Sequence, residues 1–491
     1  MTTAMSAVAM NFAGVRDPRI DGPQGDAIPF FHEGRYHLYY LEAPAGKLDQ
    51  PDRGRTPWRH VVSDDLVHWE DLGIVLPLGT REEADPDGIW TGSVIAKDGL
   101  IHIFYTGGNR PRETPQTICH ATSVDGITFT KDPRNPLFGP DTDWFEAKDW
   151  RDPFVFWNAA RGEYWMLLSG RVRQGPLGRR GVVVLCTSSD LDQWSVQPEP
   201  FYAPGNTYCM ECPEVFELGG KWRMVFSRFS EHAATMYREA DTLEGPWRMP
   251  AHDALDGARW YAAKSLTDGK GRRIAFGWVH DRRGFSDDGE WLWGGDMCLP
   301  REIYAGEDGR LCVRPPEEIE AQFAPPQPLL LRPLAGDWEG GRGGAAGKYA
   351  ATAIPVELDS PELAKLTVEA AFDDLRGGIG LSLFSGDGLN EGLDLFFSAA
   401  TGDITLGDQV AGREPDRRPT PHVTAWLPPR TSGSLRIDIY LRGDILEVFL
   451  DRQVALTHRT YSKAAIAPVL YVEDGIATIE ASFAKLGGGE L

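Results

Sequence analysis

The sequence predicts an all-β protein, a five-bladed β-propeller followed by a C-terminal antiparallel β-sandwich. Three observations lead to this prediction. A short aromatic-rich strand recurs five times, alternating apolar residues with Gly, Pro and Asp turns fill the chain, and the pattern changes after Pro315-Pro316. Alternation with a period of two and closely spaced turns are typical of strands rather than helices.

The repeated unit is a turn with Gly followed by an aromatic-rich strand. The five copies read EGRYHLYYL, DGLIHIFYT, RGEYWMLLS, GGKWRMVFS and KGRRIAFGW, and their anchoring glycines are Gly34, Gly99, Gly162, Gly220 and Gly271. A second unit, such as SDDLVHW ending at Trp69, follows four of these strands and predicts a hairpin into an outer strand. Similar all-β units at a regular spacing predict a propeller, whose closed ring leaves few exposed edges.

The chain divides into two predicted domains. Residues 1–315 carry the repeats and are predicted as the catalytic propeller, and residues 316–347 are rich in Pro and Gly and are predicted as a linker. Residues 348–491 contain short alternating strands without the repeated unit, which predicts a β-sandwich. In this second domain LRIDIYLRGDILEVFL predicts a hairpin around Arg442-Gly443-Asp444.

The composition excludes some classes of partner. The formal net charge of −22 disfavours nucleic acid and anionic membrane surfaces, whereas a neutral carbohydrate is not penalised. The 16 Trp residues suit sugar binding, because an indole face matches the C–H face of a sugar ring. No apolar stretch could span a bilayer and the first residues lack a basic, apolar leader pattern, so a cytoplasmic protein is expected.

Cysteine usage predicts neither a disulfide framework nor a metal site. The six Cys are scattered, and Cys209 and Cys212 have no second Cys or His pair nearby at metal-ligand spacing. We therefore expect no metal and no cofactor.

Carboxylates recur at one position of the repeated unit. Counting back eight to ten residues from the anchoring glycines leads to Asp26, Trp90, Asp152, Glu211 and Tyr261. The innermost strands of a propeller face its axis, so we expect these side chains to converge at one end of it. Acidic side chains are almost never fully buried unless paired, so this convergence points to a functional site rather than to core.

Three converging carboxyl groups suit glycoside hydrolysis, which needs one protonated acid and one ionised carboxylate. Glu211 lies in the stretch TYCMECPEVF, where desolvation should raise its pKa, and is predicted as the general acid/base. Asp152 follows Arg151, and this pair is predicted to orient the substrate. Asp26 remains as the nucleophile.

Each carboxylate also has a purely structural interpretation. Asp26 could be a turn residue after Gly25, Asp152 could form a surface ion pair, and Glu211 could lie at the edge of a blade. All three interpretations must hold together to remove the site, so the combination favours a functional site more strongly than any one residue does.

The motifs around these residues resemble glycoside hydrolase family 32, the group of invertases, levanases and inulinases. Trp150-Arg151-Asp152-Pro153 is similar to its Arg-Asp-Pro motif, and Met210-Glu211-Cys212-Pro213 is similar to its Glu-Cys motif. Further family segments resemble WRHVVSDDLVHWE (residues 58–70), WTGS (residues 90–93), FGWV (residues 276–279) and LPRE (residues 299–302). The resemblance covers both predicted domains.

The resemblance implies a retaining enzyme that acts on β-fructofuranosyl bonds with an Asp nucleophile, a Glu acid/base and a transition-state-stabilising Asp. The matching positions are Asp26, Glu211 and Asp152, in agreement with the roles inferred from their local contexts. The predicted substrate-binding residues are Arg151, Trp90, Trp58, Ser93, Tyr261, Trp278 and Trp293.

The first family motif is altered in this chain. Gly25-Asp26-Ala27-Ile28-Pro29 stands where the family usually shows Asn-Asp-Pro-Asn-Gly, and Leu41 follows Tyr40 where the family has Gln. The resemblance assigns these amides to sugar binding in the first subsite, so we expect an altered glycone or linkage. Asp17, in Arg16-Asp17-Pro18, is a rival nucleophile that is out of phase with the repeat.

The sequence thus predicts a β-fructofuranosidase-like glycosidase that cleaves sucrose or short fructo-oligosaccharides as a monomer or homodimer. Three alternatives stay open. They are a fructosyltransferase that forms a difructose anhydride or an oligosaccharide, an inverting arabinan-type furanosidase, and a non-catalytic sugar-binding protein.

Overall fold

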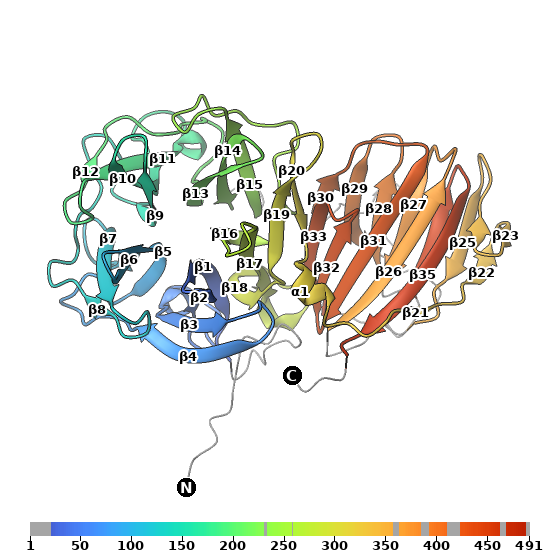
Figure 1. Cartoon of the computed structure of the whole chain (residues 1–491), viewed down its shortest axis with the longest axis horizontal. Helices are drawn as coiled ribbons and strands as arrows, with labels where there is room; N and C mark the ends of the chain where they lie inside the picture. The colour runs from blue at the N-terminus through green and yellow to red at the C-terminus, as the bar shows by residue number, and fades with distance from the viewer. Residues whose placement is uncertain are drawn as a thin grey trace, which may run out of the picture.

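The computed structural model describes residues 21–229, 233–257, 259–356, 363–383, 392–409, 423–461 and 468–487. Strands dominate these residues, as the sequence predicts, and the one α-helix among them is a single turn, α1 (Glu317–Glu320). In the described part of the chain no helix has the length and apolarity needed to cross a bilayer. Figure 1 shows an N-terminal ring of sheets beside a C-terminal pair of layered sheets.

The ring is built on five hairpins that follow the repeated unit. The strands after the anchoring glycines are β2 (Arg35–Glu42), β6 (Leu100–Gly108), β10 (Glu163–Arg171), β14 (Lys221–Arg228) and β17 (Arg273–Arg282). Each pairs antiparallel with the strand before it: β1 (Gln24–His32), β5 (Gly88–Lys97), β9 (Arg151–Asn158), β13 (Glu211–Leu218) and β16 (Tyr261–Thr267). The strands of this second group contact one another around the centre, and β16 contacts β1 (Figure 1).

Outer strands complete the sheets. They are β3 (Trp58–Ser63), β4 (Trp69–Leu76), β7 (Gln116–Ser123), β8 (Thr130–Lys131), β11 (Gly181–Ser188), β12 (Ser195–Val196), β15 (Ala234–Ala240), β18 (Trp291–Met297), β19 (Arg301–Ala305) and β20 (Leu311–Arg314). The short 3-10 turns between them are η1 (Asp52–Gly54), η2 (Leu177–Arg179) and η3 (Arg283–Phe285).

The second sequence unit forms the turn into an outer strand, as predicted. In its first copy the Asp65 carboxylate accepts the backbone N–H groups of Val67 and His68 at 2.9 and 2.8 Å. The indole of Trp69 then donates to the Leu66 carbonyl at 3.0 Å, and β4 begins at this Trp. The unit therefore has a structural role, because its Asp caps the turn and its Trp packs into the core.

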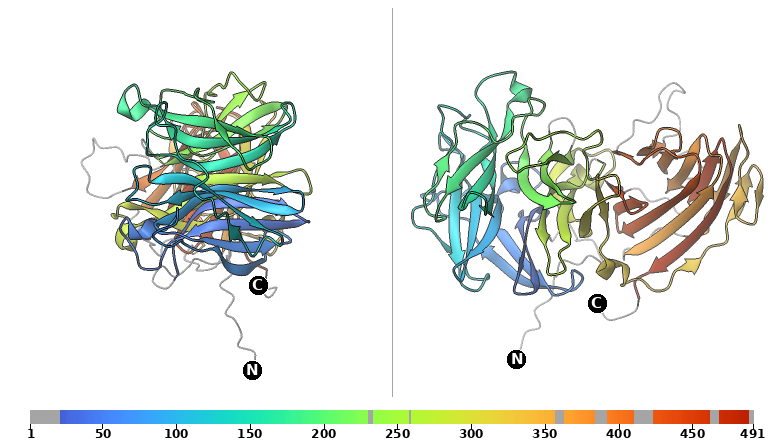
Figure 2. Two further views of the ribbon diagram at one scale, coloured as in Figure 1. Left: turned by 90° about the vertical axis from the view of Figure 1, so that its left-hand side faces the viewer. Right: turned by 45° about the horizontal axis from the view of Figure 1, so that its top comes forward.

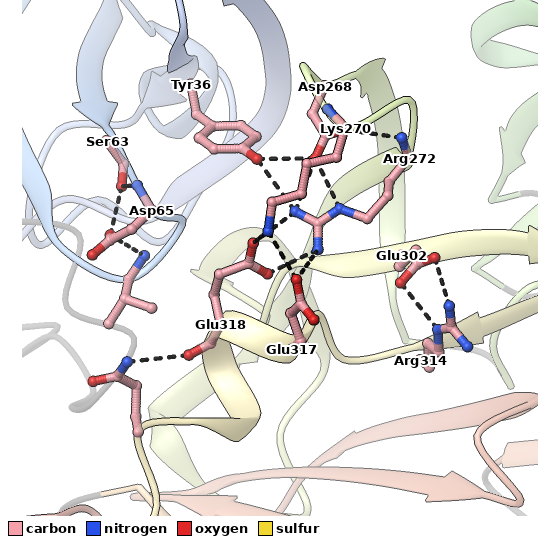
Figure 3. Close-up of polar contacts among 12 residues, drawn as sticks. Tyr36, Ser63, Asp65, Asp268, Lys270, Arg272, Glu302, Arg314, Glu317 and Glu318 are labelled. Carbon is pink, nitrogen blue, oxygen red and sulfur yellow. Dashed lines mark hydrogen bonds and ion pairs between the residues drawn. The ribbon is translucent and has the colours of Figure 1, made fainter.

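One strand pairing and several side-chain contacts join the first and last hairpins of the ring. β18 and β1 pair only between Gly295 and Gln24, which merges these two regions into one nine-stranded sheet. The Tyr36 hydroxyl on β2 donates to Asp268, in the turn between β16 and β17, at 3.0 Å. Figure 3 shows that Lys270 and Arg272 extend from this turn to α1. α1 thus ties the end of the ring to the start of the second domain.

The C-terminal domain consists of two antiparallel sheets. One runs in the order β23–β24–β35–β26–β31–β32–β33 with β21 beside β35, and the other in the order β22–β25–β34–β27–β28–β29–β30. Their bounds are β21 (Gln327–Pro328), β22 (Arg332–Ala335), β23 (Trp338–Glu339), β24 (Arg342–Gly343), β25 (Tyr349–Ala353), β26 (Ala364–Phe372), β27 (Gly378–Leu383), β28 (Gly392–Ser398), β29 (Asp403–Gln409), β30 (Val423–Trp426), β31 (Gly433–Arg442), β32 (Ile445–Leu450), β33 (Val454–Arg459), β34 (Val469–Glu473) and β35 (Ala477–Lys485).

Alternate residues of these strands fill the space between the two sheets. Leu366, Val368, Ile437 and Ile439 belong to this buried cluster, as the period-two pattern requires. The predicted hairpin is formed by β31 and β32, with Arg442 paired to Ile445. The segment predicted as a linker, residues 316–347, contains α1 and β21 to β24, and β21 and β24 pair with β35.

The sandwich packs against the last hairpins of the ring (Figure 2). Buried ion pairs cross this boundary. Arg301 on β19, which also contacts Asp256 of the ring at 2.8 Å, pairs with Glu447 on β32 at 3.1 Å. A second pair joins Arg459 on β33 to Asp296 on β18 at 2.5 Å. Removing one partner of a buried pair leaves an uncompensated charge, so these contacts hold the two domains in a fixed relation.

A stacked pair of histidines, half-buried His37 and buried His60, makes the stability of the fold depend on pH. His37 and His60 stack with ring centroids 5.2 Å apart, and burial lowers their pKa values to about 4 and about 3. Both rings are neutral in the folded state, whereas unfolded His titrates near 6.5. Because the unfolded chain binds more protons below that pH, stability should fall as the pH drops from about 6.5.

We predict that His60→Phe, which keeps a ring in the stack, makes the loss of stability between pH 7 and pH 5 shallower. His60 alone should account for about 2 kcal/mol of this loss at pH 5. Urea unfolding of both proteins across this range measures the effect. Equal pH slopes for wild type and variant would contradict it.

Candidate active site

Each of the five strands nearest the centre contains an irregularity close to its first residues. The register with the neighbouring strand shifts between Gly25 and Ala27, and shifts of the same kind follow Trp90, Arg151, Glu211 and Tyr261. Such β-bulges add a residue to one strand and turn its side chain in a new direction. The bulges therefore let neighbouring residues of each strand point toward the same central space.

The register of these bulged strands differs from the alignment of the repeats that the sequence predicts. The residues seven positions after the anchoring glycines pair with Gly25, Trp90, Arg151, Glu211 and Tyr261. Asp26 and Asp152 instead lie one residue later, within the bulges. The prediction that Asp26, Trp90, Asp152, Glu211 and Tyr261 occupy equivalent positions of the repeat was wrong, because the turns between the paired strands differ in length. Two adjacent rings of residues, not one, converge on the axis.

Asp26 is held by donors from two other strands. The Thr91 hydroxyl donates to its Oδ2, and the Trp278 indole donates to its Oδ1 at 3.0 Å. Burial raises the pKa of Asp26 to about 7, the charges of Asp152 and Glu211 add to this rise, and the two donors oppose it. This carboxyl group can therefore change its ionisation near neutral pH.

Asp152 is buried and fixed in an unusual backbone conformation. Its φ of 61° lies in the left-handed region, which costs energy for a residue other than glycine. The Cys212 backbone N–H donates to Asp152 Oδ2 at 2.9 Å, and the Ser169 hydroxyl lies 3.2 Å from the same oxygen. The Asp152 N–H donates to the Thr106 hydroxyl oxygen at 2.9 Å. These bonds from three neighbouring strands compensate for the strain and fix the direction of the carboxylate.

Glu211 lies between a cation and a phenol. Arg151 Nη2 is 2.7 Å from its Oε1, and the Tyr261 hydroxyl donates to its Oε2. Burial raises the pKa of Glu211 above its usual value, as the sequence predicted; Arg151 opposes this rise and the charge of Asp152 adds to it. The Arg151 guanidinium also contacts Asp149 at 2.7 Å and lies 3.8 Å from Asp152.

The three carboxylates line one small cavity of about 170 Å³. Its other lining residues are Leu41, Gln50, Gly54, Trp90, Gln116, Arg151 and Trp293. This volume is below the roughly 300–1,000 Å³ typical of sites for drug-sized ligands, which suits one small unit of a larger molecule. Charged groups line part of this cavity, and Leu41, Trp90 and Trp293 form an apolar wall of it.

The altered first motif shapes the apolar wall. A Cβ at Gly25 would lie 2.6 Å from Cη2 of Trp293, so the indole occupies the space that a side chain at this position would need. Leu41, which stands at the position of the absent Gln, pairs with Gly25 across β1 and β2. The amides expected from the family pattern are therefore replaced by an indole and an aliphatic group.

The other predicted substrate-binding residues lie behind the cavity lining. Tyr261 and Trp278 are buried and contact Glu211 and Asp26, as described above. Trp58 is fully buried and donates to the Trp90 carbonyl at 3.2 Å. The Ser93 hydroxyl accepts the backbone N–H of Val155 at 2.9 Å and so ties two inner strands together. Among the predicted residues, Trp90, Arg151 and Trp293 do line the cavity.

Sequence reasoning missed several residues of the site. Gln50 and Gln116 line the cavity, Thr91 binds Asp26, and the Cys212 backbone binds Asp152. Thr91 and Cys212 adjoin predicted residues in the motifs WTGS and MECP, and this was the signal available. Asp17 lies outside the described residues. No group of three or more His, Cys, Asp or Glu in the described ranges has a metal-binding arrangement.

Family models match both domains. The N-terminal domain model of glycosyl hydrolases family 32 matches residues 21–315, and the C-terminal model of the same family matches residues 345–486. The chain belongs to glycoside hydrolase family 32. This confirms the resemblance seen in the motifs.

Two relatives are similar over about three fifths of the chain. A raffinose invertase of Escherichia coli is 29% identical over 318 residues, which cover 61% of this chain and 63% of that protein. A fructan 1-exohydrolase of Triticum urartu is 29% identical over 324 residues, which cover 60% of this chain and 52% of that protein. The chain thus spans between half and two thirds of the length of these relatives.

Solved structures share the fold over nearly the whole chain. Fructan 1-exohydrolase IIa from Cichorium intybus superposes with a TM-score of 0.76 at 19% identity, covering 97% of this chain and 98% of the other. Sucrose-6-phosphate hydrolase from Lactobacillus gasseri gives a TM-score of 0.71 at 20% identity, covering 97% and 93%. At these identities the likeness concerns the fold.

We predict that Gly25→Ala destabilises the protein, because the added methyl group overlaps the Trp293 indole. Overpacking of this kind costs about 1–3 kcal/mol. The cost of Gly25→Ala should be smaller when it is introduced into the Trp293→Ala variant, where the indole is absent. Urea unfolding measures both effects. Gly178→Ala is the matched control, since nothing lies within 4 Å of a Cβ at that position. Equal stability of Gly25→Ala and wild type would show that the wall can move aside.

Proposed function

We propose that this chain is a retaining glycosidase that cleaves a β-fructofuranosidic bond in sucrose or in short fructo-oligosaccharides. One observation carries the proposal: Asp26, Asp152 and Glu211 line the same small cavity, with raised pKa values for Asp26 and Glu211. The reaction needs one protonated acid and one ionised carboxylate. The raised pKa of Glu211 favours the acid role, and Asp26, with a pKa of about 7, is ionised above that pH. The names of the relatives support the fructofuranoside class.

In the proposed first step Glu211 gives its proton to the leaving oxygen while Asp26 attacks the anomeric carbon. The bond to the leaving group breaks and an ester forms between the sugar and Asp26. Arg151 and Tyr261 each hold one oxygen of Glu211, so this carboxyl group cannot rotate away. Once the leaving group departs, ionised Glu211 takes a proton from water, which displaces Asp26.

Asp152 and Arg151 are proposed to stabilise the positive charge that develops on the sugar ring. The contacts of Asp152 to Cys212, Ser169 and Arg151 all involve Oδ2. Oδ1 is therefore available to accept a ring hydroxyl. A carboxylate whose direction is fixed beforehand needs little reorganisation when charge develops, which is the usual source of electrostatic catalysis.

We also propose that the ring has five blades, with β1–β4 and β16–β20 as separate blades that meet at the Gln24–Gly295 pair. Five mutually contacting inner strands support this count. We propose a catalytic domain that ends at residue 315, the limit of the N-terminal family model. The sequence predicts a sandwich that begins at residue 348, but β21 to β24 already belong to its two sheets, so we propose that the sandwich begins with β21.

The test of function is purified protein incubated with sucrose, levanbiose, inulin, levan and arabino-oligosaccharides, with the products identified by chromatography and proton NMR. Released fructose supports the proposal. Release of arabinose, formation of a difructose anhydride, or no reaction at all would assign the site to another activity. The anomeric form of the first product decides the mechanism, because attack by Asp26 gives retention and direct attack by water gives inversion.

We predict that Asp26→Asn lowers kcat by about four orders of magnitude, because an amide cannot form the ester intermediate. Binding of the sugar should persist, since Asn preserves the shape and can accept hydrogen bonds. Initial rates and calorimetric binding measure the two effects. Asp143→Asn, an exposed carboxylate outside the cavity lining, is the control. Wild-type turnover in Asp26→Asn would remove the assignment.

We predict that kcat/KM falls on the acid side near pH 7, and that this fall occurs at a higher pH in Thr91→Val. Asp26 is ionised above its pKa of about 7, and the Thr91 hydroxyl favours the ionised form. Removing this donor should raise the pKa by about one unit, since hydrogen bonds to charged groups contribute about 1.5–3 kcal/mol. A pH–rate profile measures the shift. A fall at an unchanged or lower pH would show that another group controls it.

A further inference from the structure

Gln116 is a polar residue of the cavity lining that has no part in the steps proposed above. It is the first residue of β7, and its half-buried side chain lies at the cavity beside Arg151. Its Oε1 accepts two hydrogen bonds, from the backbone N–H of Trp150 at 2.9 Å and from Nη1 of Arg151 at 3.2 Å. These two bonds tie β7 to the start of β9 and hold the amide at the cavity wall.

The same two bonds determine which way round the amide lies. Both partners are N–H donors, and of the two polar atoms of a Gln side chain only the oxygen can accept from them. A nitrogen in that position would place donor against donor. Nε2 therefore takes the other position, and its N–H groups have no hydrogen-bond partner among the residues that the structure describes.

The place of Gln116 in the lining indicates which part of a substrate it meets. At about 170 Å³ the cavity suits one small unit of a larger molecule, and Asp26, Asp152 and Glu211 line it together. A unit that lies against the proposed nucleophile and acid is the sugar that is transferred. Gln116 lines the same space, so its amide meets the transferred sugar rather than the leaving group.

The altered first motif gives this amide its importance. Leu41 and the Trp293 indole stand where the family pattern has amides. Among the lining residues only Gln50 has another amide side chain, and it is exposed. An ionised carboxylate can only accept hydrogen bonds, so the transferred sugar also needs donors. A hydroxyl that accepts from Nε2 keeps its own proton for a carboxylate, and bonds linked in this way strengthen each other.

We propose that Gln116 is a specificity-determining residue, whose Nε2 donates to one hydroxyl of the transferred furanosyl unit and so replaces an amide of the missing motif. This inference rests on the proposed glycosidase function and deepens it, because it names a group that selects the sugar. A site that binds a hydroxyl in this way discriminates against a sugar without it, since the donor is then left unpaired.

The test combines changes in the residue with changes in the substrate. Sucrose is compared with a series of analogues, each of which lacks one hydroxyl of the fructosyl unit. In wild type the loss of the hydroxyl that Gln116 binds should lower kcat/KM about tenfold. In Gln116→Met, which has a similar shape but no amide, the same analogue should be cleaved as well as sucrose, because the partner of that hydroxyl is already absent.

Gln116→Glu separates sugar binding from a purely structural role. This variant keeps an oxygen that can accept from Trp150 and Arg151, but it removes both N–H donors of the side chain. The same analogue should therefore lose its penalty in this variant too. A residue that only positions Arg151 would change the rate for sucrose and for every analogue by the same factor. Unchanged penalties for all analogues in both variants would overturn the proposal.

Gln197→Met is the matched control. Gln197 is half-buried and lies outside the cavity lining, and its Nε2 donates to the Thr187 hydroxyl oxygen at 3.4 Å. The variant removes the same chemical group at a distance from the site, so every analogue should keep its wild-type penalty. Loss of the penalty in Gln197→Met as well would show that the effect does not arise in the cavity, and the assignment to Gln116 would fall.

A binding measurement separates failure of this inference from failure of the proposed function. If wild type cleaves no fructoside, the glycosidase proposal fails, and calorimetric titration with fructose and with arabinose still tests the amide. Binding of either sugar that weakens about tenfold in Gln116→Met, but not in Gln197→Met, supports the inference. Equal binding to all three proteins, or no binding of either sugar to wild type, would overturn it.

Discussion

A single guanidinium group, that of Arg151, lies among the carboxylates at the centre of the propeller. It contacts Glu211 at 2.7 Å, contacts Asp149 at 2.7 Å and lies 3.8 Å from Asp152. Burial and the charge of Asp152 raise the pKa of Glu211, and this cation opposes that rise. With it, the charges are partly balanced near Glu211 and Asp152, while Asp26 is held by the neutral donors Thr91 and Trp278. The proposed chemistry depends on this uneven distribution of charge.

The position of that cation depends in turn on the bulged starts of the inner strands. In a regular strand Arg151 and Asp152 would point to opposite faces. The register shift and the positive φ of Asp152 bring both side chains to the axis. The same device places Asp26 and Thr91 in contact, although they lie on different strands. The strain is tolerated because hydrogen bonds from neighbouring strands fix each bulge, so the site and the closed ring stabilise each other.

The sandwich reaches this site through a chain of buried charges. Arg459 on β33 lies 3.8 Å from Asp281, which contacts Arg53 at 2.7 Å. Arg53 donates to the Trp293 carbonyl at 2.5 Å, and Trp293 forms the apolar wall of the cavity next to Gly25. The sandwich contains none of the three carboxylates, yet it supports Trp293, which stands in the cavity wall where the family pattern has amides. This gives the second domain a physical role in shaping the sugar pocket.

The sequence by itself determined the all-β class, the five hairpins and the sandwich, and it pointed to Asp26, Asp152 and Glu211 as the candidate carboxylates. Strand periodicity, turn residues and short motifs are local properties of the chain, and they can be read without coordinates. Only the tertiary structure decided which side chains share the cavity. It placed Trp58 and Ser93 behind the wall, brought Gln50 and Gln116 into the lining, and moved Asp26 and Asp152 one residue out of the expected phase. The physical reason is that bulges and hairpin lengths shift the register by single residues, and a shift of one residue reverses the direction of a side chain.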